Sequence, residues 1–147
     1  MRVAIGCDPN ASRLKRELID ELVALGHDVD DLGSDDPIYA NVVINVGESV
    51  AAQSHDRGIV LCGTGIGASI AANKVPGVYC ALVTDVYQAE RAALSNNANL
   101  IALGSQVTGD KLARALVRPW MAHEYSPGRR SDAKVRRISD YARSRAK

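Results

Sequence analysis

Strand-like segments alternate with helix-like segments along the whole chain, and this alternation constrains the fold more than any other feature. The strand-like segments are, in order, "RVAIG", "HDVDDLG", "GIVLC", "VYCALV" and "NLIALG". Four of them are short apolar runs, the pattern of buried strands, and the second is more polar. Strands that alternate with helices form βαβ units. The sequence therefore predicts an α/β fold with a five-stranded parallel sheet and helices on both faces.

The helix-like segments carry start and stop signals. "ASRLKRELIDELVALG" has leucines at helical spacing and ends at Gly26. "PIYANVVINVGESVAAQS" begins with Pro37, a good residue for a first helical turn, and Asp85 is placed to cap "VYQAERAALSN". A charged amphipathic helix is expected over about 131–146. Since no linker, repeat or low-complexity segment interrupts the pattern, residues 1–147 are interpreted as a single domain.

Length, charge and cysteine content exclude several classes of function. A chain of 147 residues is long enough for one domain with its own core. A net charge of +1 does not indicate a nucleic-acid or acidic partner. Three cysteines without a CxxC pair argue against a disulfide framework and a zinc site. Because no signal peptide or membrane span is visible, we expect a cytoplasmic protein with no membrane partner.

Polar and glycine-rich clusters follow three of the expected strands. They are "GCDPNAS", "CGTGIGAS" and "TDVYQ", and a fourth cluster, "SNNAN", precedes the fifth strand. In parallel sheets, ligands bind beyond the carboxyl ends of the strands. We therefore expect the functional site among these clusters.

The glycine-rich loop after the third strand, Gly63 to Gly67, fits none of three common phosphate-binding patterns. The dinucleotide fingerprint needs GxGxxG after the first strand, and the loop of nucleotide hydrolases ends in Lys and then Ser or Thr. A thiol phosphatase would carry Arg six positions after its cysteine, where this chain has Ala68. What remains is a turn before a helix, whose N–H groups stabilise a fixed or developing anion.

Cys62, at the mouth of this loop, has two interpretations. A helix N-terminus favours the thiolate form of a nearby cysteine, which then acts as a general base. Alternatively, Cys62 is a small buried hydrophobic residue, as most free cysteines are. Cys7 and Cys80 are interpreted as structural, since Cys80 lies within an apolar strand.

Five segments spread along the chain occur together in one known family. They are "GCD", "DDPIYA", "GIVLCGTGIGASIAANKVPGVYCALVTD", "SNNANLIALGSQ" and the basic C-terminal helix. In these segments, from Met1 to about Ile138, the chain resembles the type-B ribose 5-phosphate isomerases and their galactose 6-phosphate isomerase relatives. The resemblance implies a Rossmann-like (flavodoxin-like) domain and a metal-free aldose–ketose isomerase without cofactor. It also implies a homodimer or tetramer with active sites between subunits.

The resemblance also implies roles for individual residues. Cys62 would be the base that removes a proton next to the substrate carbonyl, and Thr64 would act on substrate hydroxyls. The loop glycines with Ser69 would hold the enediolate oxygens. Further substrate contacts are implied for Asp8, Tyr39 and Asn96. The residues implied for the loop contacts are Gly63, Gly65, Gly67 and Ser69.

Two histidines common in the family are missing from the matching positions, which hold Pro9 and Ser95. In the family the first helps to bind the sugar phosphate, and the second helps to open the sugar ring. A four-carbon sugar phosphorylated on its last oxygen cannot close a five-membered ring, so it needs no ring-opening acid. This favours erythrulose 4-phosphate and erythrose 4-phosphate as the interconverted pair. Alternatively, Ser95 or a partner-subunit residue opens the ring of a pentose phosphate.

The phosphate needs a cationic site, which in the family comes from two arginines four residues apart at the start of the last helix. Arg130 and Lys134 have that spacing here, and Arg129 is the alternative if the register slips by one. We expect this helix to reach the partner subunit. The same basic tail could be a solvated helix face. A nucleic-acid partner is not expected, because the tail carries one aromatic residue and no binding motif.

Three functions therefore compete. The first is a sugar-phosphate isomerase acting on erythrulose 4-phosphate, with ribose 5-phosphate as the alternative substrate. The second is a non-catalytic subunit that supports a related partner. The third is a regulator that senses a sugar phosphate.

Overall fold

The computed structural model describes residues 1–146, and its centre is a five-stranded parallel sheet. The strands are β1 (Arg2–Cys7), β2 (Asp28–Asp31), β3 (Arg57–Cys62), β4 (Cys80–Leu82) and β5 (Leu100–Gly104). Their order across the sheet is β2-β1-β3-β5-β4, and every neighbouring pair is parallel. The predicted α/β fold is confirmed. β5 lies between β3 and β4, whereas flavodoxin itself has the order 2-1-3-4-5.

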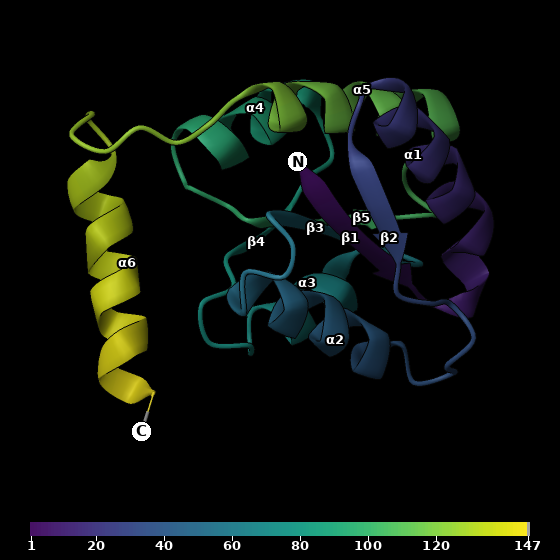
Figure 1. The fold of residues 1–147 in the computed structure, drawn as a ribbon, viewed down its shortest axis with the longest axis horizontal. Helices are drawn as coiled ribbons and strands as arrows, with labels where there is room; N and C mark the ends of the chain where they lie inside the picture. Colours follow the sequence, from purple (N-terminus) through teal and green to yellow (C-terminus); the bar gives the residue numbers. More distant parts are fainter. Residues whose placement is uncertain (147) are drawn as a thin grey trace.

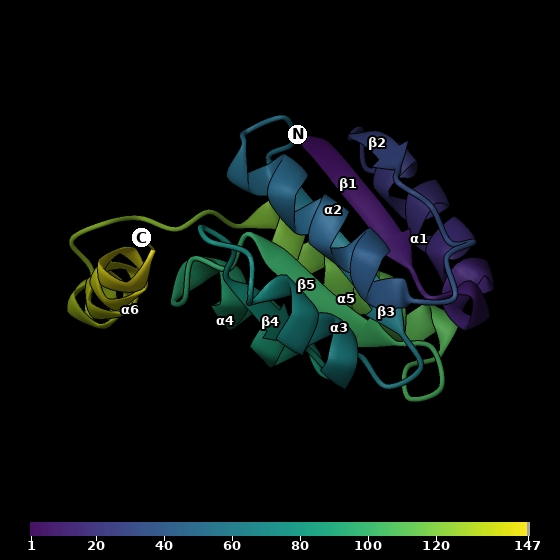
Figure 2. The same cartoon turned by 90° about the horizontal axis from the view of Figure 1, so that it is seen from below.

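Helices cover both faces of the sheet (Figures 1 and 2). A short 3-10 helix, η1 (Pro9–Ala11), follows β1. The longer helices are α1 (Ser12–Ala24), α2 (Tyr39–Ala51), α3 (Ile66–Ala72), α4 (Val86–Leu94), α5 (Asp110–Ala122) and α6 (Asp132–Arg145). α1, α4 and α5 pack on one face, while α2 and α3 pack on the other.

The core divides into two clusters because side chains alternate across the strands. In β3, Ile59 and Leu61 join the cluster under α1, α4 and α5, whereas Val60 and Cys62 join the cluster under α2 and α3. All six residues of β3 are buried, as expected for the central strand of a covered parallel sheet. The alternation aims the Cys62 side chain at the α3 side of the sheet, where the glycine-rich loop lies.

Several element boundaries differ from those expected from the sequence. α2 begins at Tyr39, two residues after Pro37, and β4 has only three residues. β4 is short because it is an edge strand that pairs with β5 alone. The predicted cap of α4 is confirmed, since the Asp85 carboxylate accepts a hydrogen bond from the Gln88 N–H at 2.9 Å.

α6 stands apart from the rest of the molecule (Figures 1 and 2). It packs against no other helix or strand as closely as those elements pack on one another. A segment without helix or strand, residues 123–131, connects it to α5, and its second half consists of turns. Within the described residues, no helix has the length and apolarity needed to span a membrane.

Candidate active site

Cys62 lies at the carboxyl end of β3, next to the neighbouring ends of β1 and β5. Its side chain is 4% exposed. The Gly65 N–H donates a hydrogen bond to the Cys62 Sγ at 3.1 Å. An N–H directed at sulfur stabilises negative charge on it, so this contact suits a thiol that acts as a base.

The glycine-rich loop keeps its shape because two positions exclude larger residues. Gly65 has a φ of +79°, and a Cβ there would lie 2.7 Å from Cδ1 of Leu82. A Cβ on Gly67 would overlap the hydroxyl of Tyr39, the first residue of α2. The Tyr39 side chain therefore extends from α2 to the glycine-rich loop and lies at the mouth of the loop, where it is expected from the sequence. The N–H groups of Gly67 and Ala68, in the first turn of α3, lack helical acceptors.

Asp8 and Thr64 lie at the same edge of the sheet. The Asp8 N–H donates to the Leu61 carbonyl at 2.9 Å, which places Asp8 beside the end of β3. Its carboxylate caps the 3-10 helix by accepting from the Asn10 N–H at 2.8 Å. The Thr64 side chain is exposed, and its hydroxyl accepts from the Ile66 N–H at 3.3 Å.

Two residues at this edge differ from the prediction. Ser69 was expected to contact the substrate, and Gln106 was not expected at the site. The Ser69 side chain lies near the Cys80 thiol on β4, where burial raises the thiol pKa and Ser69 acts to lower it. Gln106, in the loop after β5, was not predicted. Its Oε1 is 3.0 Å from the position that a Cβ of Gly63 would occupy, and its N–H donates to the Gly63 carbonyl at 2.9 Å. Only its place after a strand could have pointed to it.

We call the residues gathered at this carboxyl edge the thiol half-site. It consists of Asp8, Tyr39, Cys62, Gly63, Thr64, Gly65 and Gly67. The other two cysteines, Cys7 and Cys80, lie outside the thiol half-site. Burial raises the pKa of Cys7 to about 11 and that of Cys80 to about 12, so both stay protonated thiols at neutral pH. Their predicted structural role agrees with this.

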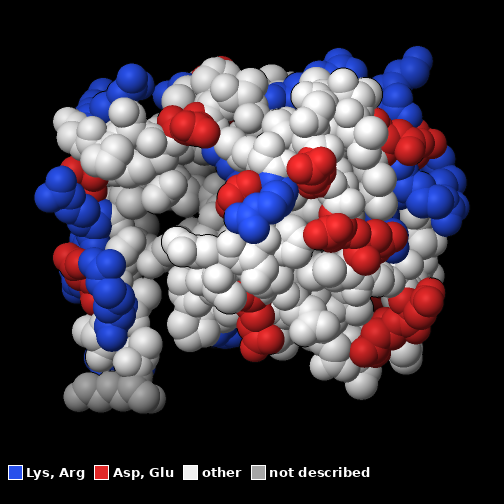
Figure 3. Space-filling view, viewed as in Figure 1, with Lys and Arg blue, Asp and Glu red and all other residues white. Residues whose placement is uncertain are grey.

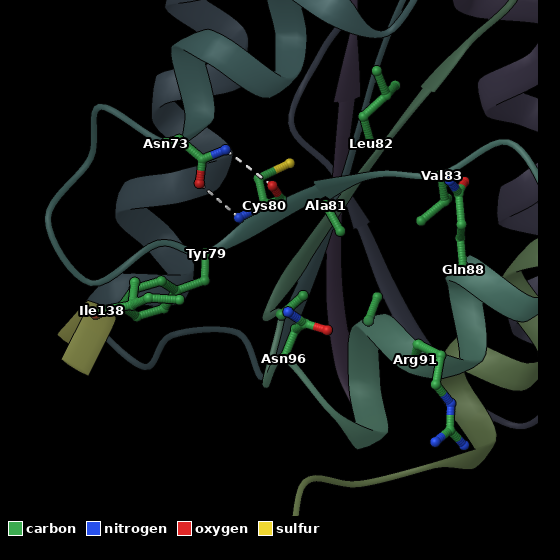
Figure 4. Close-up of a pocket in the computed structure, with 12 residues that line it drawn as sticks. Asn73, Tyr79, Cys80, Ala81, Leu82, Val83, Gln88, Arg91, Asn96 and Ile138 are labelled. Carbon is green, nitrogen blue, oxygen red and sulfur yellow. Dashed lines mark hydrogen bonds between the residues drawn. The ribbon is translucent and has the colours of Figure 1, made fainter. Parts of the chain in front are cut away.

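Asn96 lies at the opposite edge of the sheet. It precedes Leu100, the first residue of β5, which pairs with Gly58 near the start of β3. β3 has six residues, so about 20 Å separates its two ends. Asn96 lines a cavity of about 420 Å³ between β4, α4 and Ile138 of α6 (Figure 4), and Cys62 does not line it. One chain therefore does not bring Asn96 to the thiol.

Arg130 and Lys134 are also far from Cys62. Arg130 precedes α6 and Lys134 lies in its first turn, and both side chains are exposed. Figure 3 shows Lys and Arg side chains along α6, with a groove between this helix and the body. We call Asn96, Arg130 and Lys134 the cation half-site.

None of the three histidines belongs to either half-site. His27 contacts the N-terminal amine at 3.2 Å, and His55 contacts the carboxylate of Asp30 at 2.8 Å. His123 contacts the Pro119 carbonyl at 2.7 Å. All three histidines are partly buried. In residues 1–146, no three His, Cys, Asp or Glu side chains are grouped so as to hold a metal ion.

Comparison with known proteins connects this arrangement to one family. Residues 3–138 match the family model described as Ribose/Galactose Isomerase. A D-erythrulose-4-phosphate isomerase 2 of Mycolicibacterium smegmatis is 41% identical, covering 96% of this chain and 97% of the relative. A ribose-5-P isomerase B of Listeria innocua is also 41% identical, covering 92% of this chain and 93% of the relative.

The fold agrees with a solved structure of the same kind. Ribose-5-phosphate isomerase B of Clostridium thermocellum superposes with a TM-score of 0.91 at 39% identity, covering 98% of this chain and 99% of that one. The resemblance noted in the sequence is thereby confirmed. The chain belongs to the ribose/galactose isomerase family, a family of sugar-phosphate isomerases.

Proposed function

We propose that this chain interconverts erythrulose 4-phosphate and erythrose 4-phosphate through an enediolate, with Cys62 as the base. The Cys62 thiolate removes a proton from C1 of the ketose, and the electron pair moves to form the C1–C2 double bond of the enediolate. The Cys62 thiol then returns the proton to C2, which leaves an aldehyde at C1. Transfer to and from one positioned group suits both directions of an isomerisation.

The loop supplies what the enediolate needs. Negative charge develops on oxygen as the proton leaves carbon, and N–H groups fixed beforehand stabilise such charge. Gly65 already directs its N–H at the sulfur, and the N–H groups of Gly67 and Ala68 in the first turn of α3 lack helical acceptors. Asp8 and Thr64 are exposed enough to bind substrate hydroxyls. The proton on the C1 oxygen of the enediolate moves to the C2 oxygen through the Thr64 hydroxyl.

The observation that carries the choice of substrate is the lack of a ring-opening group. Ser95 occupies the position of the family's ring-opening histidine, and its hydroxyl is 3.5 Å from Nη1 of Arg91 at the end of α4. The three histidines of the chain are engaged elsewhere. An aliphatic hydroxyl such as that of Ser95 ionises far above neutral pH, so it is a poor general acid there. A four-carbon substrate, which has no five-membered ring to open, fits this site.

Sequence identity does not separate the two substrates. A relative named for erythrulose 4-phosphate and one named for ribose 5-phosphate are both 41% identical to this chain. The proposal therefore rests on Ser95 and on the engaged histidines. Ribose 5-phosphate stays the second candidate because of the relatives that carry its name.

We further propose that a second copy of the chain completes the site. The cation half-site would bind the phosphate and a hydroxyl of a substrate held at the partner's thiol half-site. Exposed apolar side chains support contact between copies on this side of the molecule. They lie on α3, β4, α4 and α6, and they are Ile66, Ile70, Leu82, Val86, Tyr87, Ile138 and Tyr141.

The test is a comparison of kcat/KM for the erythrulose 4-phosphate enantiomers and for ribose 5-phosphate. A clear preference for one tetrulose phosphate is expected. A preference for ribose 5-phosphate would overturn the substrate assignment and direct attention to Ser95. No turnover of any of them, with thermal stabilisation by the sugar phosphates, would favour a sensor. No turnover and no stabilisation would favour a supporting subunit.

A further inference from the structure

Arg57 is a buried cation that the proposed chemistry does not use. It begins β3, at the end of the sheet opposite Cys62, and is 8% exposed. Among residues 1–146, no carboxylate lies within ion-pair distance of it, and Glu124 is the one acidic residue whose charge favours the guanidinium. Its partners are instead two main-chain carbonyls and an aromatic ring. These contacts determine what Arg57 holds in place at the end of a neighbouring helix.

The contacts of Arg57 all lie at the C-terminal end of α5. Nη1 donates to the Trp120 carbonyl, and Nη2 donates to the His123 carbonyl at 2.6 Å. The guanidinium also lies over the Trp120 ring, 5.0 Å from its centroid. The last carbonyls of a helix lack helical donors, and a cation is favourable at this end. Arg57 therefore binds the last turn of α5 and the first residue beyond it.

α5 ends without the glycine that closes many helices. His123 follows the helix with φ −118° and ψ 150°, so the chain leaves in an extended conformation. The two carbonyls held by Arg57 lie on either side of this exit. The exit direction is therefore set by a side chain from β3, and it starts the segment 123–131 that leads to α6.

The same segment is also joined to α6 by a side-chain hydrogen bond. The Tyr125 hydroxyl donates to Oδ1 of Asp132, the first residue of α6, at 2.7 Å. Asp132 also pairs with Arg136 one turn later at 2.5 Å. Segment 123–131, which we call the strap, is thus fixed to the body at its start and joined to α6 through Tyr125, whereas α6 itself has little packing against the body.

We infer that Arg57 is a positioning residue for phosphate binding, which fixes where the strap carries Arg130 and Lys134. This inference rests on the proposed function in one respect only, that these two cations bind the phosphate. Arg57 touches neither substrate nor thiol. Its loss would leave the thiol half-site intact and would weaken the delivery of the cations to the partner's site.

The first test is independent of turnover. Trp120 is the only tryptophan of the chain, so its emission reports on the guanidinium above it. In Arg57→Met, we expect a shifted emission spectrum and faster trypsin cleavage after Arg129 and Arg130. Arg118→Met, which removes an ion pair from the exposed side of α5, is the matched control and should change neither. Unchanged cleavage in Arg57→Met would overturn the inference, whatever the substrate proves to be.

The second test uses kinetics in two backgrounds. Arg57→Met should raise KM about tenfold and leave kcat within about twofold, because it acts on binding. In the Arg130→Ala/Lys134→Ala background, the same change should alter KM by less than about twofold, since residues that act through one another are not additive. An equal effect in both backgrounds would overturn the inference.

A third variant, Arg57→Lys, keeps the inference testable if Arg57→Met does not fold. Arg57→Lys keeps the charge but cannot bridge both carbonyls in the manner of a planar guanidinium. If Arg57→Met does not fold, Arg57→Lys should show the same rise in KM and in cleavage, at reduced size. Wild-type KM and wild-type cleavage in Arg57→Lys would then contradict the inference.

Discussion

The thiol half-site and the cation half-site are built in opposite ways. The thiol half-site sits at the end of a fully buried strand, with Cys62 covered and Gly65 fixed between β4 and β5. Arg130 and Lys134 of the cation half-site are exposed, on a strap and a helix that pack loosely on the body.

This difference corresponds to the two tasks that the proposed reaction sets. Stabilising an enediolate needs donors fixed before the reaction, and burial provides them. Capturing a phosphate needs positive charge that can meet another molecule at its surface. The comparison predicts that damage to the first half-site lowers kcat, whereas damage to the second raises KM.

Removing the thiol should have the largest effect. Cys62→Ala deletes the proposed base, so kcat should fall by about 10³-fold or more, in line with general base catalysis. Thermal stabilisation by the substrate should persist, because Ala is small enough to leave the loop in place. A substantially active Cys62→Ala protein would refute the assignment of the base.

Filling the space at Gly67 should have the next largest effect. Gly67→Ala places a methyl group on the Tyr39 hydroxyl, and overpacking of this kind costs about 1–3 kcal/mol. We expect a lower Tm and a kcat/KM reduced by about tenfold or more. Gly67→Ala/Tyr39→Phe should recover part of the lost Tm, since the overlapping oxygen is gone. If the double variant is no better than Gly67→Ala, Tyr39 does not contact the loop as described.

Removing a cation should change KM and spare kcat. Arg130→Ala should raise KM about tenfold, as expected for the loss of one charged contact to phosphate. Arg143→Ala, which removes an exposed arginine at the other end of α6, is the matched control and should leave KM unchanged. A normal KM in Arg130→Ala would place phosphate binding elsewhere, with Arg129 as the next candidate.

The smallest effect concerns the scaffold shared by both half-sites. α1 and α5 are joined by ion pairs at three successive turns, Arg13–Asp110, Glu17–Arg114 and Glu21–Arg118. The Arg118 hydrogen bond lowers the pKa of Glu21 below its ordinary value of 4.5. A carboxylate with a lowered folded-state pKa stabilises the protein above its unfolded value and loses that contribution as pH falls through the folded one.

Tm should therefore fall as the pH is lowered below about 4.5, where the unfolded Glu21 takes up protons first. Glu21→Gln should make this fall shallower and should leave KM at neutral pH unchanged. A steeper fall in Glu21→Gln would contradict the sign of the shift.

Local sequence patterns predicted the elements of the fold and most of the thiol half-site. The apolar runs predicted the strands, Asp85 predicted the cap of α4, and "CGTGIGAS" predicted the loop. These patterns are informative because each involves residues that are close in the chain. The sequence predicts that α2 begins at Pro37, whereas the helix begins at Tyr39. Tyr39 contacts the loop at Gly67, and a contact so distant along the chain is not visible in a local pattern.

Contacts between distant segments were not visible in the sequence. Three such contacts depend on how the elements pack. They are the Gln106 amide beside Gly63, the Ser69 side chain near Cys80, and the hydrogen bonds of Arg57 to the end of α5. The pattern also did not reveal that Asn96 and Cys62 lie at opposite edges of the sheet, which depends on strand order and direction.

Mixing a variant without the base and a variant without the cations, assayed at a substrate concentration below the wild-type KM, tests most directly whether the half-sites of two copies make one site. Cys62→Ala lacks the thiol half-site's base, and Arg130→Ala/Lys134→Ala lacks the cations. In a two-fold symmetric dimer, each mixed pair contains one site with both parts intact, so random mixing should restore about one quarter of wild-type activity near the wild-type KM. Activity that stays at the level of the separate variants would contradict the account, because it would mean that each chain supplies its own complete site.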